Sequence, residues 1–144
     1  QIVRKESQKH WTISSSPRTP ADTVKIMANL AADFPNVNFF DYKKTEPGWI
    51  ERQYDACSVV WVTSDSISMI YEALTAGCKV GILPIQWLTK YNKFKKNEDL
   101  LQRKGLVISL SSWMQGNAIW QENVELNEAQ HCAERILKKW SPKN

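Results

Sequence analysis

Residues 58–84 read SVVWVTSDSISMIYEALTAGCKVGILP, and this stretch decides the fold. It begins with an apolar run at 58–63, passes through a Ser-Asp-Ser turn into a helical pattern at 66–76, and returns through Gly77 to a second apolar run at 79–83. Both runs are apolar at successive positions, which is typical of central parallel strands covered by helices on both faces. A strand, a helix and a second strand in this order predict a parallel unit with a helical crossover.

The same alternation extends along the chain in both directions. Further strands are predicted at 10–16, 37–41 and 106–110, and further helices at 21–33, 48–56, 93–104 and 127–140. We therefore expect a single α/β domain over residues 1–144, with a doubly wound, Rossmann-like parallel sheet. In such a sheet, ligands bind outside the carboxyl ends of the strands.

The composition indicates one ordinary folded core. The chain has 144 residues, of which 42% are hydrophobic and 24% are charged, as in a typical globular domain. It begins with Gln1 and not with Met, and the first predicted strand follows almost at once. We interpret it as part of a longer two-domain protein whose N-terminal domain is missing.

The three cysteines indicate a reducing compartment. Cys57, Cys78 and Cys132 are odd in number and far apart, and they form no C-x-x-C pair. This spacing argues against both a disulfide framework and a zinc site. No apolar stretch is long enough to cross a bilayer. We therefore expect a cytoplasmic protein that binds no metal, with a peripheral position at a membrane as an alternative.

The positive charge is concentrated in one region. The formal net charge is +4, and residues 86–105 alone carry an excess of the same size. Within this region, Trp87–Lys96 mixes lysines with aromatic residues, a composition that suits peripheral contact with a membrane. A solvated helix face is the simpler interpretation. Nucleic acid is not expected as a partner, because no recognition motif accompanies the cluster.

The Ser-Asp-Ser turn is the best candidate for a binding site. Ser64, Asp65 and Ser66 follow a buried strand and precede a helix. Short polar side chains in this position can cap the first N–H groups of the helix. The same N–H groups and the positive end of the helix dipole can bind a diphosphate. The competing interpretation is a helix cap with no ligand.

A polar face on the following helix extends this candidate site. Asp65, Ser68 and Glu72 are spaced at i, i+3 and i+7, which predicts one shared face. Glu72 lies roughly 10 Å beyond Asp65 at a rise of about 1.5 Å per residue, the separation of a nucleotide's diphosphate from its ribose. Its carboxylate can accept hydrogen bonds from both ribose hydroxyls. Alternatively, Glu72 is an ordinary exposed glutamate.

The stretch VWVTSDSISMIYEALTAGCKVGILP resembles the donor-binding region of GT-B glycosyltransferases. Together with SSSPRTP at 14–20, it resembles more closely the Elm1-type mitochondrial fission family of bacteria and plants, over essentially the whole chain. That resemblance implies the C-terminal domain of a GT-B-like fold. It also implies a nucleotide-diphosphate sugar as the ligand, with Ser64, Ser66 and Ser68 around the diphosphate and Glu72 at the ribose.

The resemblance also points to the loop after the first strand. The family's loop is similar to S-S-R-R-T-P, whereas this chain has Pro17 in place of the first arginine and keeps Arg18. Ser16 and Arg18 are therefore candidate phosphate ligands, and the double-arginine feature is absent. The stretch 86–105 is loosely similar to a GT-B segment that flanks the donor sugar.

Other chemistries lack their motifs. The sequence has no G-x-G-x-x-G, no P-loop, no H-E-x-x-H and no G-x-S-x-G, and no catalytic base can be assigned. No cofactor is expected apart from the nucleotide sugar as a substrate. In GT-B enzymes the acceptor pocket belongs largely to the other domain, so the isolated domain should be inactive. A non-enzymatic adaptor that keeps the fold and recruits a protein partner to a membrane is the alternative function.

Overall fold

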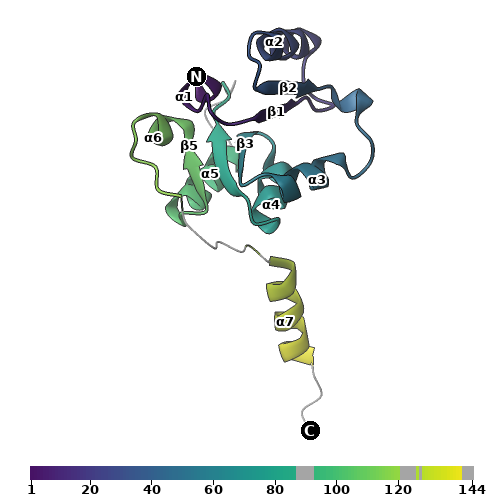
Figure 1. The fold of residues 1–144 in the computed structure, drawn as a ribbon. Helices are drawn as coiled ribbons and strands as arrows, with labels where there is room; N and C mark the ends of the chain where they lie inside the picture. The colour runs from purple at the N-terminus through teal and green to yellow at the C-terminus, as the bar shows by residue number, and fades with distance from the viewer. Residues whose placement is uncertain (87–92, 121–125, 127, 141–144) are drawn as a thin grey trace. The chain divides into compact units, whose positions relative to one another are not determined.

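The computed structural model describes residues 1–86, 93–120, 126 and 128–140. Contacts divide the chain into two compact units, Gln1–Trp49 and Ile50–Asn144, and each unit contains one parallel sheet (Figure 1). The predicted α/β class with parallel strands is confirmed. The strands form two sheets, however, where one continuous sheet was expected.

The first unit contains a two-stranded sheet and one long helix. Strands β1 (Trp11–Ser14) and β2 (Val37–Phe40) pair in parallel, with Trp11 opposite Val37, and α2 (Ala21–Ala32) is the crossover between them. Pro20 is the N-cap residue of α2, with φ −59°, and the helix starts at Ala21, as the sequence pattern predicted. The elements of this unit are α1 (Ile2–Lys5), β1 (Trp11–Ser14), α2 (Ala21–Ala32), β2 (Val37–Phe40) and the short 3-10 helix η1 (Tyr42–Lys44).

The second unit contains a three-stranded parallel sheet in the order β3-β4-β5. Strand β4 is central, as its sequence predicted. Strand β3 lies at an edge of this sheet, so its expected central position is wrong, and α6 was not expected from the sequence. The elements are α3 (Trp49–Ala56), β3 (Val59–Thr63), α4 (Ile67–Thr75), β4 (Lys79–Leu83), α5 (Lys93–Arg103), β5 (Val107–Ser109), α6 (Leu110–Met114) and α7 (Glu128–Trp140).

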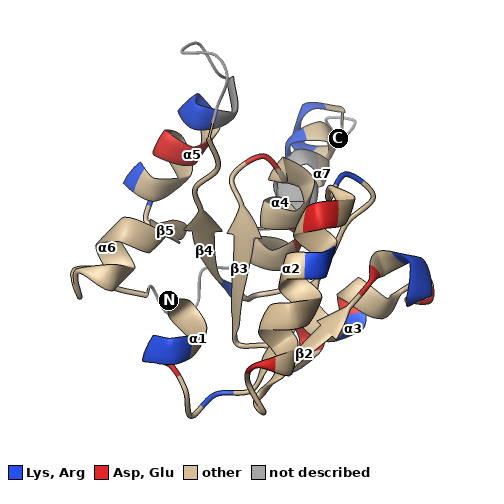
Figure 2. Ribbon diagram, turned by 90° about the horizontal axis from the view of Figure 1, so that it is seen from above, with Lys and Arg blue, Asp and Glu red and all other residues tan. Residues whose placement is uncertain are grey.

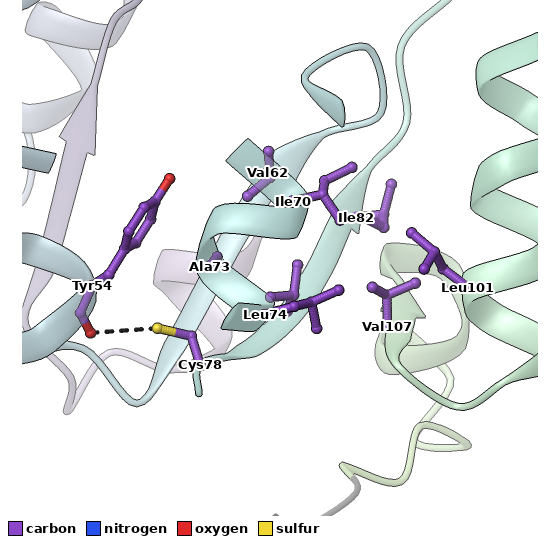
Figure 3. Packing of buried hydrophobic residues seen from close by; sticks show 10 residues of the cluster. Tyr54, Val62, Ile70, Ala73, Leu74, Cys78, Ile82, Leu101 and Val107 are labelled. Carbon is purple, nitrogen blue, oxygen red and sulfur yellow. Dashed lines mark hydrogen bonds between the residues drawn. The ribbon is translucent and has the colours of Figure 1, made fainter. Parts of the chain in front are cut away.

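One face of this sheet carries the hydrophobic core. Ile70, Ala73 and Leu74 of α4 are at most 1% exposed and pack against the strands (Figure 3). Fully burying one large aliphatic side chain contributes about 1.5–3 kcal/mol, so these contacts fix α4 on the sheet. The remaining members of the core are Tyr54, Val62, Cys78, Val80, Ile82, Leu101 and Val107.

The other face is covered by tryptophan. Trp61 of β3 lies opposite Gly81 of β4, and a side-chain Cβ at Gly81 would overlap the Trp61 ring. The Trp61 ring contacts Trp113 and Trp120 edge-on, at centroid distances of 5.4 and 6.1 Å. Glycine at position 81 therefore makes the space that the aromatic cluster occupies.

Helix α4 ends where the sequence predicted, at Gly77. This residue has φ 81°, a conformation that glycine adopts without steric cost. The Gly77 N–H donates to the Leu74 carbonyl at 3.0 Å, and the Cys78 N–H donates to the Ala73 carbonyl at 2.9 Å. These two bonds form a Schellman motif. The chain then enters β4 directly, so both ends of α4 are positioned by the sheet.

The thiol of Cys78 links α3 to the start of β4. It donates to the backbone carbonyls of Tyr54 at 3.4 Å and Cys57 at 3.6 Å, and burial raises its pKa. A neutral, buried thiol packs in the core as a small apolar side chain does. Across the described residues, no helix combines the length and hydropathy needed to cross a membrane.

Candidate functional site

The start of α4 lies at the carboxyl end of the sheet in the second unit. The Ser64 N–H donates to the Leu83 carbonyl at 2.9 Å, which continues the pairing of β3 with β4 by one residue. The Ser66 N–H then donates to the Thr63 carbonyl at 3.0 Å and closes a tight turn. This turn delivers the chain from the strand into the helix within three residues.

Ser66 occupies the N-cap position of α4 without capping it through its side chain. Its φ and ψ are −97° and 62°, and its hydroxyl makes no hydrogen bond to the first turn. The predicted side-chain cap is therefore wrong at this residue. The Ser66 hydroxyl instead lies 3.2 Å from Thr63 Oγ1. The first turn of α4 contains no acidic residue.

Ser64 is a buried polar residue whose hydroxyl is unused. The residue is 1% exposed, and its Oγ has no hydrogen-bond partner among the described residues. Burying a hydroxyl without a partner costs about 1–3 kcal/mol. Such an atom in a native fold needs an explanation, and no pattern in the sequence predicts it.

The polar face predicted along the helix is shorter than expected. Asp65 is half-buried and lies in the turn, before α4 begins at Ile67, so it does not share a helix face with the other two residues. Ser68 and Glu72 are both exposed, and their i, i+4 spacing places them on one side of α4.

Two further polar groups flank α4, and sequence reasoning missed both. On one side, the hydroxyl of Tyr54 in α3 is buried and has no partner. On the other side, Tyr71 donates to Asn97 Oδ1 at 3.1 Å, and Asn97 Nδ2 is buried and has no partner. Together with Ser64 Oγ, these are the unpartnered buried side-chain atoms of the described residues. Because they come from separate segments, no local pattern could have grouped them.

The negative charge of Glu72 also affects the pKa of Tyr54. This pKa is raised to about 12, mainly because the phenol is buried and secondarily because of the negative charge of Glu72. Burial disfavours the phenolate, and a nearby carboxylate disfavours it further. The phenol is therefore neutral at physiological pH and available as a hydrogen-bond donor.

Ser16 and Arg18 belong to the first unit, in the turn after β1. The Ser16 N–H donates to Thr19 Oγ1 at 2.9 Å, and the hydroxyls of Ser16 and Thr19 lie 3.1 Å apart. Arg18 is exposed. The polar groups of Ser16 thus serve their own turn, and a role for either residue in binding phosphate stays a prediction.

The predicted aromatic-basic cluster lies partly outside the described residues, which omit 87–92. Among its described basic residues, Lys95 is paired, with Nζ 3.4 Å from Glu98 Oε1 and 3.2 Å from Asp99 Oδ1. Figure 2 shows these acidic residues between the basic ends of α5. Among the described residues, no group of three His, Cys, Asp or Glu side chains could hold a metal ion.

Comparison with known proteins supports the resemblance found in the sequence. A family model described as mitochondrial fission ELM1 matches residues 1–140. Searches of curated proteins and of solved structures returned no match. The family match spans both strand-to-helix turns and nearly the whole chain. The chain belongs to the mitochondrial fission ELM1 family.

Proposed function

We propose that this chain binds the nucleoside diphosphate part of a nucleotide sugar at the start of α4, as the donor-binding domain of a glycosyltransferase-like protein. One observation carries the proposal. The hydroxyl of Ser64 is buried and unpartnered at the carboxyl end of the sheet, in the turn that leads into a helix whose N-cap side chain does not cap it.

The chemistry of the turn suits a diphosphate. The N-terminal end of an α-helix carries a partial positive charge and N–H donors, which together favour a bound anion. The hydroxyls of Ser66 and Ser68 can donate further hydrogen bonds to phosphate oxygens. The first turn of α4 itself has no acidic residue, and the nearest carboxylate along the chain is that of Asp65 in the turn before it.

The exposed carboxylate of Glu72 extends the site to the ribose. It lies six residues beyond Ser66, or about 9 Å along the helix at about 1.5 Å per residue. This is the reach from a diphosphate to the ribose of the same nucleotide. A carboxylate can accept hydrogen bonds from two hydroxyls at once, which selects a ribose with both hydroxyls present.

In this function, the domain stabilises the diphosphate as a leaving group. Fixed dipoles and hydroxyl donors can stabilise the charge that develops there without a metal ion. The acceptor pocket and the catalytic base would belong to a second domain. The isolated chain is thus expected to bind the donor and not to catalyse transfer.

Calorimetric titration with uridine, guanosine and adenosine diphosphates tests the proposal. At least one should bind, and Glu72→Gln should weaken that binding about tenfold, the effect of losing about 1.4 kcal/mol. Glu46→Gln is the matched control, because Glu46 is an exposed glutamate of the first unit. Absence of binding by all three, or equal affinity in wild type and Glu72→Gln, would overturn the site.

A second candidate function is a non-enzymatic adaptor that recruits a partner to a membrane. The family description favours it, and so does α7, on which Ile136, Leu137 and Trp140 are 59%, 65% and 75% exposed. Exposed apolar side chains on one helix are typical of an interaction surface.

Sedimentation with isolated mitochondria tests this adaptor function. Replacing Ile136, Leu137 and Trp140 together by serine should abolish co-sedimentation. Ile119→Ser is the control, because Ile119 is 83% exposed and lies outside α7. If the triple variant sediments as wild type does, this surface does not recruit the protein. A Glu72→Gln variant that sediments normally would show that recruitment does not need the nucleotide site.

A further inference from the structure

Tyr54 has a buried hydroxyl that packing does not explain. The residue is 5% exposed and belongs to the core cluster that includes Ala73 of α4. Its backbone carbonyl accepts the hydrogen bond from the Cys78 thiol, but within the described part of the chain its hydroxyl has no partner. Phenylalanine would fill the same space without burying an unpaired polar atom. The stability of the fold therefore does not explain the presence of this hydroxyl.

The hydroxyl points along α4 toward the proposed ligand site. In Figure 3 the Tyr54 ring extends from α3 beside α4, with its hydroxyl directed away from Cys78 and toward the end of the helix at which Ile70 lies. Glu72 immediately precedes Ala73 in α4, and its side chain is exposed. The charge of Glu72 contributes to the raised pKa of Tyr54, so the two groups lie within electrostatic range.

We propose that Tyr54 is a positioning residue for Glu72, whose carboxylate it turns toward the ribose of a bound nucleotide by donating a hydrogen bond. This inference rests on the proposed function. A carboxylate has about four acceptor sites, so it can accept from Tyr54 and from the ribose hydroxyls together. A bound ligand excludes water from Glu72, which strengthens the bond to the phenol.

This role predicts that loss of the Tyr54 hydroxyl lowers the affinity for the ligand without lowering the stability of the protein. In the free protein the hydroxyl has no partner, so its removal should leave stability unchanged or raise it. In the complex the hydroxyl pairs with a charged group, and such hydrogen bonds are stronger than neutral ones. Tyr71 offers the opposite case within the same unit, because its hydroxyl already donates to Asn97. Its removal should lower stability and leave affinity unchanged.

Titration of four variants with the nucleoside diphosphate that binds the wild-type chain tests the inference. Tyr54→Phe should bind about tenfold more weakly and unfold at the same or a higher temperature. The double variant Tyr54→Phe/Glu72→Gln should bind no more weakly than Glu72→Gln alone, since the phenol acts through the carboxylate. Tyr71→Phe is the control, with wild-type affinity and a lower unfolding temperature.

Several results would overturn the inference and identify which part fails. If Tyr54→Phe binds as wild type does while Glu72→Gln is weakened, the nucleotide site stands and the role of Tyr54 falls. Additive losses of affinity would show that Tyr54 does not act through Glu72, and a Tyr54→Phe chain that fails to fold would show that Tyr54 is structural. If the wild-type chain binds no nucleoside diphosphate, the proposed function itself fails.

Discussion

The turns after β1 and β3 have the same backbone plan and use their serines differently. Each strand is followed by a buried serine, Ser15 or Ser64, 6% and 1% exposed. In both turns, the serine N–H donates to the last residue of the neighbouring strand, Phe40 at 3.1 Å or Leu83 at 2.9 Å. The Ser15 hydroxyl donates to Asp41 at 3.3 Å and accepts from the Tyr42 N–H at 3.0 Å. The Ser64 hydroxyl has no partner in the part of the chain that the structure describes.

The difference separates a structural turn from a candidate binding turn. Asp41 follows β2 and also accepts the Lys43 N–H at 3.1 Å, so the Ser15 turn is tied to the segment after its neighbouring strand. Pro84 follows β4, and its apolar ring has no side-chain oxygen or nitrogen, so the residue corresponding to Asp41 offers Ser64 no side-chain partner. Polar groups that the fold does not use are available to a ligand. This supports the α4 turn as the ligand site over the turn that holds Ser16 and Arg18.

The largest expected effect on stability is at Ser15. Ser15→Ala removes the donor to Asp41 and leaves the Tyr42 N–H without its acceptor. Losing a partner of a buried polar group costs about 1–3 kcal/mol, so the free energy of unfolding should fall by about this amount. Urea denaturation measures it. An unchanged midpoint would mean that the two turns do not differ in the way the hydrogen bonds indicate.

Alkaline pH should destabilise the unit that contains α4 through Tyr54. The pKa of Tyr54 is about 12 in the folded chain and 10 as its ordinary value. Between these values, the unfolded chain loses the proton and the folded chain keeps it, so the free energy of unfolding falls as pH rises. Below pH 10 this contribution is fully present. Denaturation at pH 9 and 11 should show a larger fall for wild type than for Tyr54→Phe, and equal falls would contradict the prediction.

Ser64→Ala should have a small effect on stability, in contrast to Ser15→Ala. Because the Ser64 hydroxyl forms no hydrogen bond, its removal should leave the free energy of unfolding within about 1 kcal/mol of wild type or raise it. The same change should weaken binding of a nucleoside diphosphate if the proposed site is correct. A loss of stability as large as that of Ser15→Ala would instead reveal a structural role for this hydroxyl.

The sequence predicted the elements well because their signals are local. The apolar runs around Val60 and Val80 marked the strands, and Gly77 ended α4 where its positive φ is required. The division of the strands between two sheets was not predicted, since strand pairing is a long-range property that periodicity does not encode. The same limit applied to α6, a helix of five residues, which is too short for a clear helical period.

The candidate site was predicted only in part, for a related reason. The position of Ser64, Ser66 and Glu72 at a strand-to-helix turn followed from the pattern along the chain. The partners of each side chain did not. Ser66 could have capped α4, but its hydroxyl lies next to that of Thr63, and the unpaired groups of Tyr54 and Asn97 reach α4 from other helices. Such contacts depend on packing between distant segments.

The smallest expected difference is between two matched threonines. Each turn has a Ser–Thr hydroxyl pair three residues apart, 3.1 Å for Ser16 and Thr19 and 3.2 Å for Thr63 and Ser66. Thr19 also accepts a backbone N–H at 2.9 Å, whereas the described residues provide no backbone N–H to Thr63 Oγ1. Thr19→Val should therefore lower the free energy of unfolding by about 1 kcal/mol, and Thr63→Val by about half as much. Urea denaturation of both variants under one condition measures the difference. Equal losses would show that the two turns depend on their hydroxyl pairs to the same extent, and the contrast between them would then rest on Ser15 and Ser64 alone.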